Sequence, residues 1–412
     1  MGFRHPFTVI AQQPPSLGWC SSAILGGNAV QCSSLSGPAG GFDPWVEIIE
    51  DAVRHNVREL HRYAGRPLLA VTKNNANGIG ISDVGPILDS MDEVVGLAVV
   101  RVSEAVALRK AGVTKPVLMM AHVEGEEAEK LIGIGVRLTP FHDNAQEQLA
   151  DLARRTGRPV PVHVFVDSGM NRIGMPYERA ADWITGLASG GAVKIEGAYT
   201  MFSGAIREGE AFDREHLRRF LAVIAEVRAR GIDPGVLHGA PSDQLVRFPE
   251  VNTLDLIRPG GAIYGLNEYR TDPSGLPIMD LHPVFRLRAR VVRVEQLQAG
   301  EGVSFHHRYR AQRPTWIATI PVGHTDGYPK DAAGNAQVLV GERLYPVIGL
   351  VSSNHTIIEV GTGKTVAVGD IATLVGPDRE EITPITLARR TGLERDYWVM
   401  TRLNPLLARR VV

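Results

Sequence analysis

Short apolar runs alternate with helical stretches over the first two thirds of the chain. The runs occupy eight ranges, which are Leu68–Thr72, Val94–Val100, Val117–Met120, Val136–Leu138, Val160–Val166, Val193–Phe202, Gly235–His238 and Leu254–Ile257. The stretches between them, such as Ser103–Ala111 and Asp213–Arg230, carry apolar residues at helical spacing. Eight buried strands that alternate with helices are typical of a (β/α)8 barrel. The pattern therefore predicts an α/β fold of the TIM-barrel type over residues 43–270.

The barrel region is expected to begin with a helix. Asp43 suits the cap position and Pro44 the first helical position. Apolar residues then recur at helical spacing from Val46 to Leu60, and Gly65 marks the end.

The periodicity changes after about residue 270. A segment rich in Pro and Gly, Asp272–Pro283, precedes short runs of β-branched residues with partial alternation, such as Thr315–Val322 and Thr356–Val360. Such runs are typical of antiparallel strands. Gly341-Glu342 separates two of them and predicts a hairpin turn. Residues 283–412 are therefore predicted to form a mainly antiparallel β-domain.

Residues 1–42 are rich in Gly, Ser and Pro and predict a disordered extension. Pro14 and Pro15 interrupt the apolar stretch that an export signal needs, so we expect a cytoplasmic location, with the periplasm as the alternative if the extension is a degenerate signal. The net charge of -1 gives no electrostatic basis for binding nucleic acid or a membrane surface. The two cysteines, Cys20 and Cys32, both lie in this extension, so no disulfide framework is expected in the domains.

Lys73 is the first candidate for chemistry, because barrels of this type hold their active sites at the carboxyl ends of the strands. It follows the run Leu68–Thr72 and precedes a turn rich in Asn and Gly. An amine that is partly desolvated there can lose its proton near neutral pH and form a Schiff base. A lysine that only extends its charge into solvent would fit the same position, so Lys73 alone does not decide the function.

The loops after the seventh and eighth strands add a candidate anion site. Ser242 can begin a short helix, whose free N–H groups attract an anion, and the paired Gly260 and Gly261 let the backbone approach a ligand closely. Arg258 precedes these glycines, and Arg172 follows the fifth strand. Each feature also occurs in barrels for structural reasons. A phosphate grip opposite a strand-end lysine, however, is the arrangement that pyridoxal phosphate requires.

From about Trp45 to its end, the chain resembles the alanine racemases, which are pyridoxal-phosphate enzymes with a barrel and a carboxyl-terminal β-domain. The motifs that carry the resemblance span both domains and are Ala70–Gly78, Val166–Gly174, Ile257–Gly265, Gly323–Pro329 and Pro346–Ser352. The resemblance implies pyridoxal 5'-phosphate as cofactor and a small amino acid as substrate. It also implies a homodimer in which each β-domain completes the active site of its partner.

The resemblance assigns roles to the residues that match the family's motifs. Lys73 corresponds to the lysine that carries the cofactor and acts as the base on one face of the substrate. Arg258 corresponds to the arginine that faces the pyridine nitrogen, and Arg172 to the arginine near the phenolic oxygen and the substrate carboxylate. The remaining cofactor contacts fall on Ser242, Gly260, Gly261 and Asn77, the last in place of a tyrosine.

The substrate side of the site departs from the family. The family's second base is a tyrosine, and Phe305 occupies its position. Phenylalanine cannot carry a proton, so another residue must act as the base if the second face is used. The candidates are His306, with His307 and Tyr309 beside it, and His324, with His355 in a matching pocket segment. No metal is expected at these histidines, because cysteines and a helical His-x-x-x-His spacing are missing there.

Three functions follow from this pattern. The leading hypothesis is an amino-acid racemase or epimerase with a relocated second base and a substrate pocket formed by Arg172, Phe305, Ser353 and Asn354. The alternative is a lyase, aldolase or dehydratase that uses Lys73 as its only base. Phe305 favours this alternative and Arg258 opposes it, since an arginine at the ring nitrogen suits simple proton exchange. A non-catalytic cofactor-binding protein is the third hypothesis, and the complete β-domain argues against it.

Overall fold

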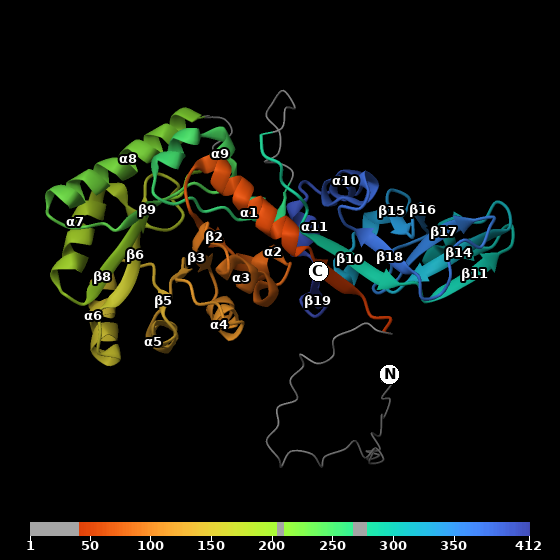
Figure 1. The fold of residues 1–412 in the computed structure, drawn as a ribbon, viewed down its shortest axis with the longest axis horizontal. Helices are drawn as coiled ribbons and strands as arrows, with labels where there is room; N and C mark the ends of the chain where they lie inside the picture. The colour runs from red at the N-terminus through yellow and green to blue at the C-terminus, as the bar shows by residue number, and fades with distance from the viewer. Residues whose placement is uncertain (1–40, 204–209, 267–277) are drawn as a thin grey trace, which may run out of the picture. The chain divides into compact units, whose positions relative to one another are not determined.

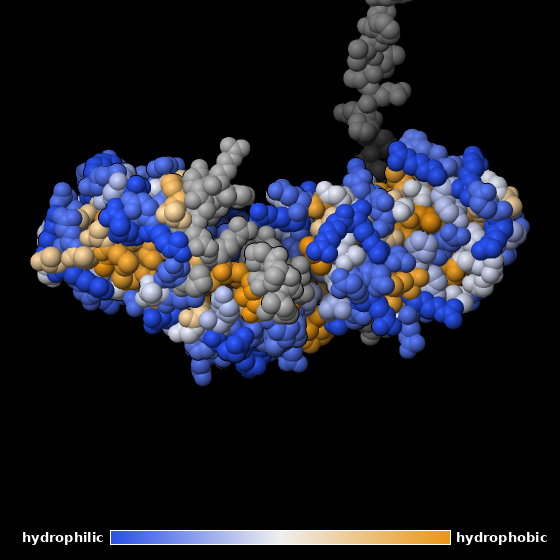
Figure 2. Space-filling model, turned by 90° about the horizontal axis from the view of Figure 1, so that it is seen from above, coloured by the Kyte–Doolittle hydropathy of each residue, from blue (hydrophilic) through white to orange (hydrophobic). Residues whose placement is uncertain are grey.

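The computed structural model describes residues 41–203, 210–266 and 278–412 (Figure 1). The extension predicted over residues 1–42, with both cysteines, lies outside the described residues except for its last two positions. In the part of the chain that is described, no helix is long and apolar enough to cross a membrane. The face drawn in Figure 2 is mostly hydrophilic, with apolar residues confined to patches.

The predicted eight-stranded barrel is confirmed. Its parallel strands are β2 (Leu68–Val71), β3 (Val94–Val99), β4 (Val117–Met119), β5 (Val136–Arg137), β6 (Val160–Asp167), β8 (Val193–Tyr199) and β9 (Val236–His238). A bridge between Leu138 and Val162 joins β5 to β6. Leu256 and Ile257 form the eighth strand, since they bridge to His238 on one side and to Leu68 on the other.

Helices alternate with these strands along the chain (Figure 1). They are α1 (Glu50–Ala64), α3 (Ile81–Asp89), α4 (Val102–Lys110), α5 (Gly125–Gly133), α6 (Ala145–Thr156), α7 (Tyr177–Ser189), α8 (Glu210–Ala229) and α9 (Ser242–Arg247). Helix α1 illustrates why they form, because it buries Val53, Val57 and Leu60 on one stripe and keeps charged residues at both ends. It ends at Gly65, whose φ of 64° is the left-handed conformation that glycine adopts readily.

The first element differs from the prediction. The helix expected from Asp43 begins only at Glu50, and Trp45–Ile48 form strand β1 instead. All four residues of β1 are buried, and the strand pairs with two strands of the carboxyl-terminal sheet. The helix prediction was wrong here because a short run that is buried on both faces carries no period, so long-range pairing decides its structure.

The predicted antiparallel β-domain is also confirmed. Its strands are β10 (Phe285–Arg290), β11 (Arg293–Leu297), β14 (Thr315–Ile320), β15 (Gln337–Val340), β16 (Arg343–Ile348), β17 (Thr356–Gly361), β18 (Ile371–Val375) and β19 (Ala408–Val411). With β1 they form one sheet in the order β11-β14-β17-β16-β15-β18-β10-β1-β19. Val340 pairs with Arg343, so Gly341-Glu342 is the predicted two-residue turn, and Gly341 has a φ of 59°.

The carboxyl-terminal tail returns to the barrel at the loop after β2. It contains α10 (Pro384–Arg390) and α11 (Tyr397–Thr401) before β19. The Arg409 guanidinium donates to the carbonyls of Gly78 and Ile79, at 3.0 and 2.9 Å. The carbonyl oxygen of Met400 lies only 2.1 Å from the point where a Cβ on Gly78 would stand. The tail therefore fixes the loop that carries Lys73.

Replacing Gly78 by alanine should destabilise the protein strongly. Gly78 has a φ of 93°, and a Cβ there would overlap the Met400 carbonyl. We expect a loss of about 4 kcal/mol in the free energy of unfolding, measured by urea denaturation. Gly65→Ala is the matched control, because Gly65 has a φ of 64° but nothing within 4 Å of its Cβ position. It should cost only about 1 kcal/mol, and equal losses in the two variants would contradict the role of Met400.

Candidate active site

Lys73 begins a short left-handed turn at the carboxyl end of β2. Asn74, Asn75, Ala76 and Asn77 follow it with φ between 53° and 57°. Asparagine tolerates this conformation better than most residues, but a run of four is strained and needs external support. The Asn75 N–H donates to the Glu104 carboxylate at 3.2 Å. The Asn74 amide donates to the Tyr397 hydroxyl at 3.3 Å.

Cationic neighbours surround the Lys73 amine. Burial lowers the pKa of Lys73 below its ordinary value, and the charges of Arg172 and Arg258 lower it further, against a smaller opposite effect of Glu104. A lowered pKa increases the fraction of neutral amine at neutral pH. The neutral amine is the form that can attack an aldehyde or accept a proton.

Arg258 is buried beside Lys73 with one donor group free. Its Nε donates to the Gly239 carbonyl at 2.8 Å, and its Nη2 donates to the Thr200 carbonyl. Its Nη1 is buried and has no partner among the described residues. Burial lowers the pKa of Arg258 to about 10, so the guanidinium is still charged at neutral pH. A buried donor without an acceptor is costly, and a ligand nitrogen or oxygen would satisfy it.

Ser242 forms a cradle together with the loop after the eighth strand. Its Oγ accepts the N–H groups of Gly260 and Ala262, at 3.1 and 3.2 Å, which leaves the hydroxyl proton available to a ligand. The cradle opens into a cavity of about 300 Å³. The predicted cofactor residues that line this one cavity are Lys73, Asn77, Ser242, Arg258, Gly260 and Gly261.

Two further residues of the cavity wall come from the carboxyl-terminal tail. Arg395 and Tyr397 line the cavity beside Lys73 and Ser242, and Tyr397 begins α11. No local sequence pattern singles them out, because the tail is distant from the barrel in the chain. Their place follows from the contacts of the tail with the loop at Gly78.

Arg172 lies outside this cavity, in a loop held by Asp167. One oxygen of the Asp167 carboxylate accepts the N–H groups of Gly169, Met170 and Asn171, at 3.0, 2.9 and 3.1 Å. Arg172 itself is exposed, and its charge acts on Lys73 and Arg258. It therefore adds positive charge near the cavity without forming its wall.

Apart from Arg172, the predicted substrate-side residues lie on the β-domain. They are Phe305, His306, His324, Ser353 and Asn354. Within the described chain, none of these five residues lines the cavity of Lys73. Phe305 is 66% exposed. His306 beside it has a φ of 65°, and Ser304 and His307 in the same loop also have positive φ. Non-glycine residues in this region store strain, and such strain often accompanies function.

His324, Ser353 and Asn354 form a second group on the β-domain. The His324 Nε2 lies 3.5 Å from the Ser353 Oγ. The Asn354 amide donates to the Thr325 hydroxyl at 3.0 Å. All of these side chains are at least partly exposed, so the group can contact a molecule that approaches the β-domain from outside.

A buried stack of rings fills the barrel beneath Arg258. The Arg258 guanidinium lies over the Tyr199 ring, 4.6 Å from its centre, and Tyr199 stacks on His238. The His238 Nε2 lies 2.8 Å from the His163 Nδ1. Burial lowers the pKa of His163 to about 4 and that of His238 well below its ordinary value.

This histidine pair should make the protein sensitive to mild acid. The unfolded chain binds protons at both histidines as the pH falls below about 6.5, whereas the folded protein resists until about pH 4 at His163. Stability should therefore fall between pH 6.5 and 4, by about 3 kcal/mol from His163 alone. Urea denaturation at several pH values measures this slope. His163→Gln should flatten the slope, and an unchanged slope would contradict the assignment.

Comparisons with known proteins agree with the geometry. The family model for the alanine racemase N-terminal domain matches residues 48–268, and the model for the C-terminal domain matches residues 284–411. The alanine racemase of Symbiobacterium thermophilum is 36% identical over 347 residues, covering 84% of this chain and 90% of that protein. The alanine racemase of Desulfovibrio desulfuricans is 35% identical over 336 residues, covering 81% and 90%.

Solved structures of alanine racemases share the fold. The enzyme of Streptomyces lavendulae superposes with a TM-score of 0.79 at 28% identity, covering 90% of this chain and 97% of that chain. The enzyme of Bacillus anthracis, solved with bound L-Ala-P, superposes with a TM-score of 0.77 at 27% identity, covering 91% and 96%.

Proposed function

The chain belongs to the alanine racemase family, and on that premise we propose that it is a pyridoxal-phosphate-dependent amino-acid racemase with an altered substrate pocket and a relocated second base. The observation that carries the proposal is the cavity that holds Lys73, Arg258 and Ser242 together. The cavity contains a nucleophilic amine, a buried guanidinium and an anion cradle. These groups match the aldehyde, the ring nitrogen and the phosphate of this cofactor.

The residues of the cavity fit the cofactor in chemical detail. Arg258 Nη1, a buried donor without a partner, would hold the ring nitrogen. Ser242, Gly260 and Gly261 would hold the phosphate, with Asn77 and Tyr397 beside them. Bound there, the cofactor supplies an aldehyde for covalent attachment and a ring that delocalises the charge left when the α-proton departs. Burial lowers the pKa of Arg258 only to about 10, so Arg258 would keep its own proton at neutral pH and would leave the ring nitrogen unprotonated.

Lys73 would serve one face of the substrate. Its lowered pKa lets the Nζ atom take the α-proton from one enantiomer and return a proton to the same face. Arg172, whose charge acts on Lys73, would attract the substrate carboxylate. Racemisation needs a second acid or base on the opposite face.

We assign the second face to the β-domain of a partner subunit. Phe305, His306, His324, Ser353 and Asn354 lie on the β-domain and outside the cavity of their own chain. The proposal is therefore a homodimer with two shared sites, in which His306 or His324 supplies the second base. Phe305, Ser353 and Asn354 would form the pocket wall, and this wall differs enough from the family's to argue against a strict preference for alanine.

A single-base reaction is the second candidate. Phe305 at the position of the family's tyrosine favours it, because Lys73 alone suffices for a lyase, an aldolase or a dehydratase. Arg258 opposes it, because an unprotonated ring nitrogen is a weaker electron sink.

A solvent-deuterium exchange assay separates these functions. The cofactor-loaded protein is incubated in D2O with a panel of single-enantiomer amino acids, and products are separated by chiral chromatography. Deuterium at Cα together with the opposite enantiomer supports the racemase. Exchange with retained configuration, or formation of a keto acid or an aldehyde, supports the single-base alternative. No exchange with any amino acid would contradict both.

A further inference from the structure

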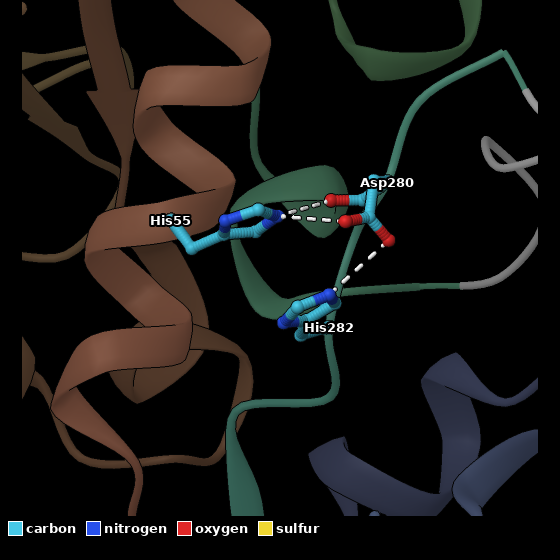
Figure 3. A group of neighbouring side chains, drawn as sticks. All are labelled: His55, Asp280 and His282. Atoms are coloured by element: carbon cyan, nitrogen blue, oxygen red, sulfur yellow. Dashed lines mark hydrogen bonds and ion pairs between the residues drawn. The ribbon is translucent and has the colours of Figure 1, made fainter.

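A second cluster of ligand-type side chains lies at the junction between the barrel and the β-domain. It consists of His55 on α1 and of Asp280 and His282 in the segment before β10 (Figure 3). In that segment Met279 and Leu281 are buried, while Asp280 and His282 are exposed. This alternation places Asp280 and His282 on the same side of the segment, facing His55 (Figure 3).

The three side chains converge on one point. The His55 Nε2 lies 3.3 Å from one oxygen of the Asp280 carboxylate, and the His282 Nε2 lies 3.1 Å from the other. One ligand atom from each residue fits within a mutual distance of 4.8 Å. The backbone carbonyl of Asp280 adds a further oxygen, 2.7 Å from the His55 Nε2.

The backbone that carries the cluster is fixed to the helix that carries His55. The buried Asn56 donates to the His282 carbonyl at 2.8 Å and accepts the His282 N–H at 2.7 Å. Glu59, one helical turn on, accepts the Asp280 N–H at 3.2 Å. These contacts fix the backbone positions of all three residues relative to one another, as the supporting contacts of a metal site do.

The chemistry of the cluster suits a metal ion better than a simple ion pair. The two imidazole rings stack with centres 4.2 Å apart and an angle of 11°, and the Nε2 atoms of both rings lie beside the same Asp280 carboxylate. Neutral imidazole is a metal ligand. Two imidazole nitrogens and one carboxylate oxygen are a common ligand set for zinc and for related transition metals.

We propose that His55, Asp280 and His282 bind a divalent transition-metal ion of the Zn²⁺ class. The ion connects α1 to the segment that leads into β10 and so stabilises the junction of the two domains. The cluster does not line the cavity of Lys73, so the site is structural and independent of the proposed reaction.

The test uses the full-length, cofactor-loaded protein after treatment with a chelator. Zn²⁺ binding is measured by equilibrium dialysis, and the melting temperature is recorded with and without Zn²⁺. We expect one Zn²⁺ per chain at the site and a melting temperature that rises by a few degrees, because an ion that binds only the folded state stabilises it. His55→Gln and His282→Gln should each weaken binding at least about tenfold and abolish the rise in melting temperature.

A matched control comes from a second exposed histidine that contacts an acid. His122 lies 3.5 Å from Glu124, and within the described chain this pair belongs to no three-residue ligand cluster. His122→Gln should bind Zn²⁺ like the unmodified protein. Should Zn²⁺ fail to bind, or should His55→Gln and His282→Gln bind it unchanged, the proposal is overturned. The absorption spectrum of the Co²⁺-loaded protein gives an independent readout. If His55→Gln and His282→Gln gave the same Co²⁺ spectrum as the unmodified protein, that would also contradict the site.

Discussion

Replacing Lys73 by arginine should lower racemisation by about 10⁴-fold in both directions. The guanidinium keeps the positive charge but cannot lose its proton near neutral pH, so it can neither attach the cofactor nor exchange the α-proton. The visible absorbance that covalent attachment gives the protein should disappear together with the activity. Both are measured on the same preparation after gel filtration, with alanine and with the best substrate of the panel.

Two controls make this prediction specific. Lys130→Arg changes an exposed lysine on α5 and should leave activity and absorbance unchanged. Lys73→Ala should regain part of its activity when methylamine is added, because a free amine can replace the missing one. If Lys73→Arg retained activity within tenfold of the unmodified protein, Lys73 could not be the base.

Local sequence patterns predict those elements whose conformation is determined by their own residues. The barrel strands are buried on both faces and therefore appear as apolar runs, and even the short run at Val136 becomes a strand. The hairpin at Gly341-Glu342 is set by its own turn residues. Strand β1 could not be predicted in this way, because its conformation depends on pairing with β10 and β19, whose residues follow far later in the chain.

The candidate site likewise contains some residues that local patterns predict and others that only tertiary contacts bring there. The strand-end position of Lys73 and the glycines after Arg258 are local signals, and these residues line one cavity. Tyr397 and Arg395 line it too, although they are brought there only by the contacts of the tail with Gly78 and Ile79. The left-handed turn had a weak signal in the three asparagines near Lys73, which tolerate positive φ. Its support by Glu104 and Tyr397 depends on tertiary structure.

Removing the second base should separate racemisation from proton exchange. Of His306→Gln and His324→Gln, the variant that lacks the base should lose about 10²- to 10⁴-fold in racemisation. It should still exchange the α-proton of one enantiomer through Lys73, which is measured by deuterium incorporation. His307→Gln is the control for damage to the loop, because the His307 ring packs over Gly302 of its own domain. If His306→Gln and His324→Gln both racemise at full rate, neither histidine is the second base.

Mixed dimers then test whether that base acts across the interface. The variant that has lost racemisation is co-expressed with Lys73→Ala, and the mixed dimer is purified through two different tags. If each β-domain completes the site of its partner, one of the two sites in a mixed dimer has both Lys73 and the second base. Such dimers should therefore have about half the activity of the unmodified dimer. If the base served its own chain instead, every site would lack one group and the mixed dimer would be inactive. Within the described chain, none of the five substrate-side residues on the β-domain lines the cavity of Lys73 in the same subunit. We therefore expect the mixed dimer to be active.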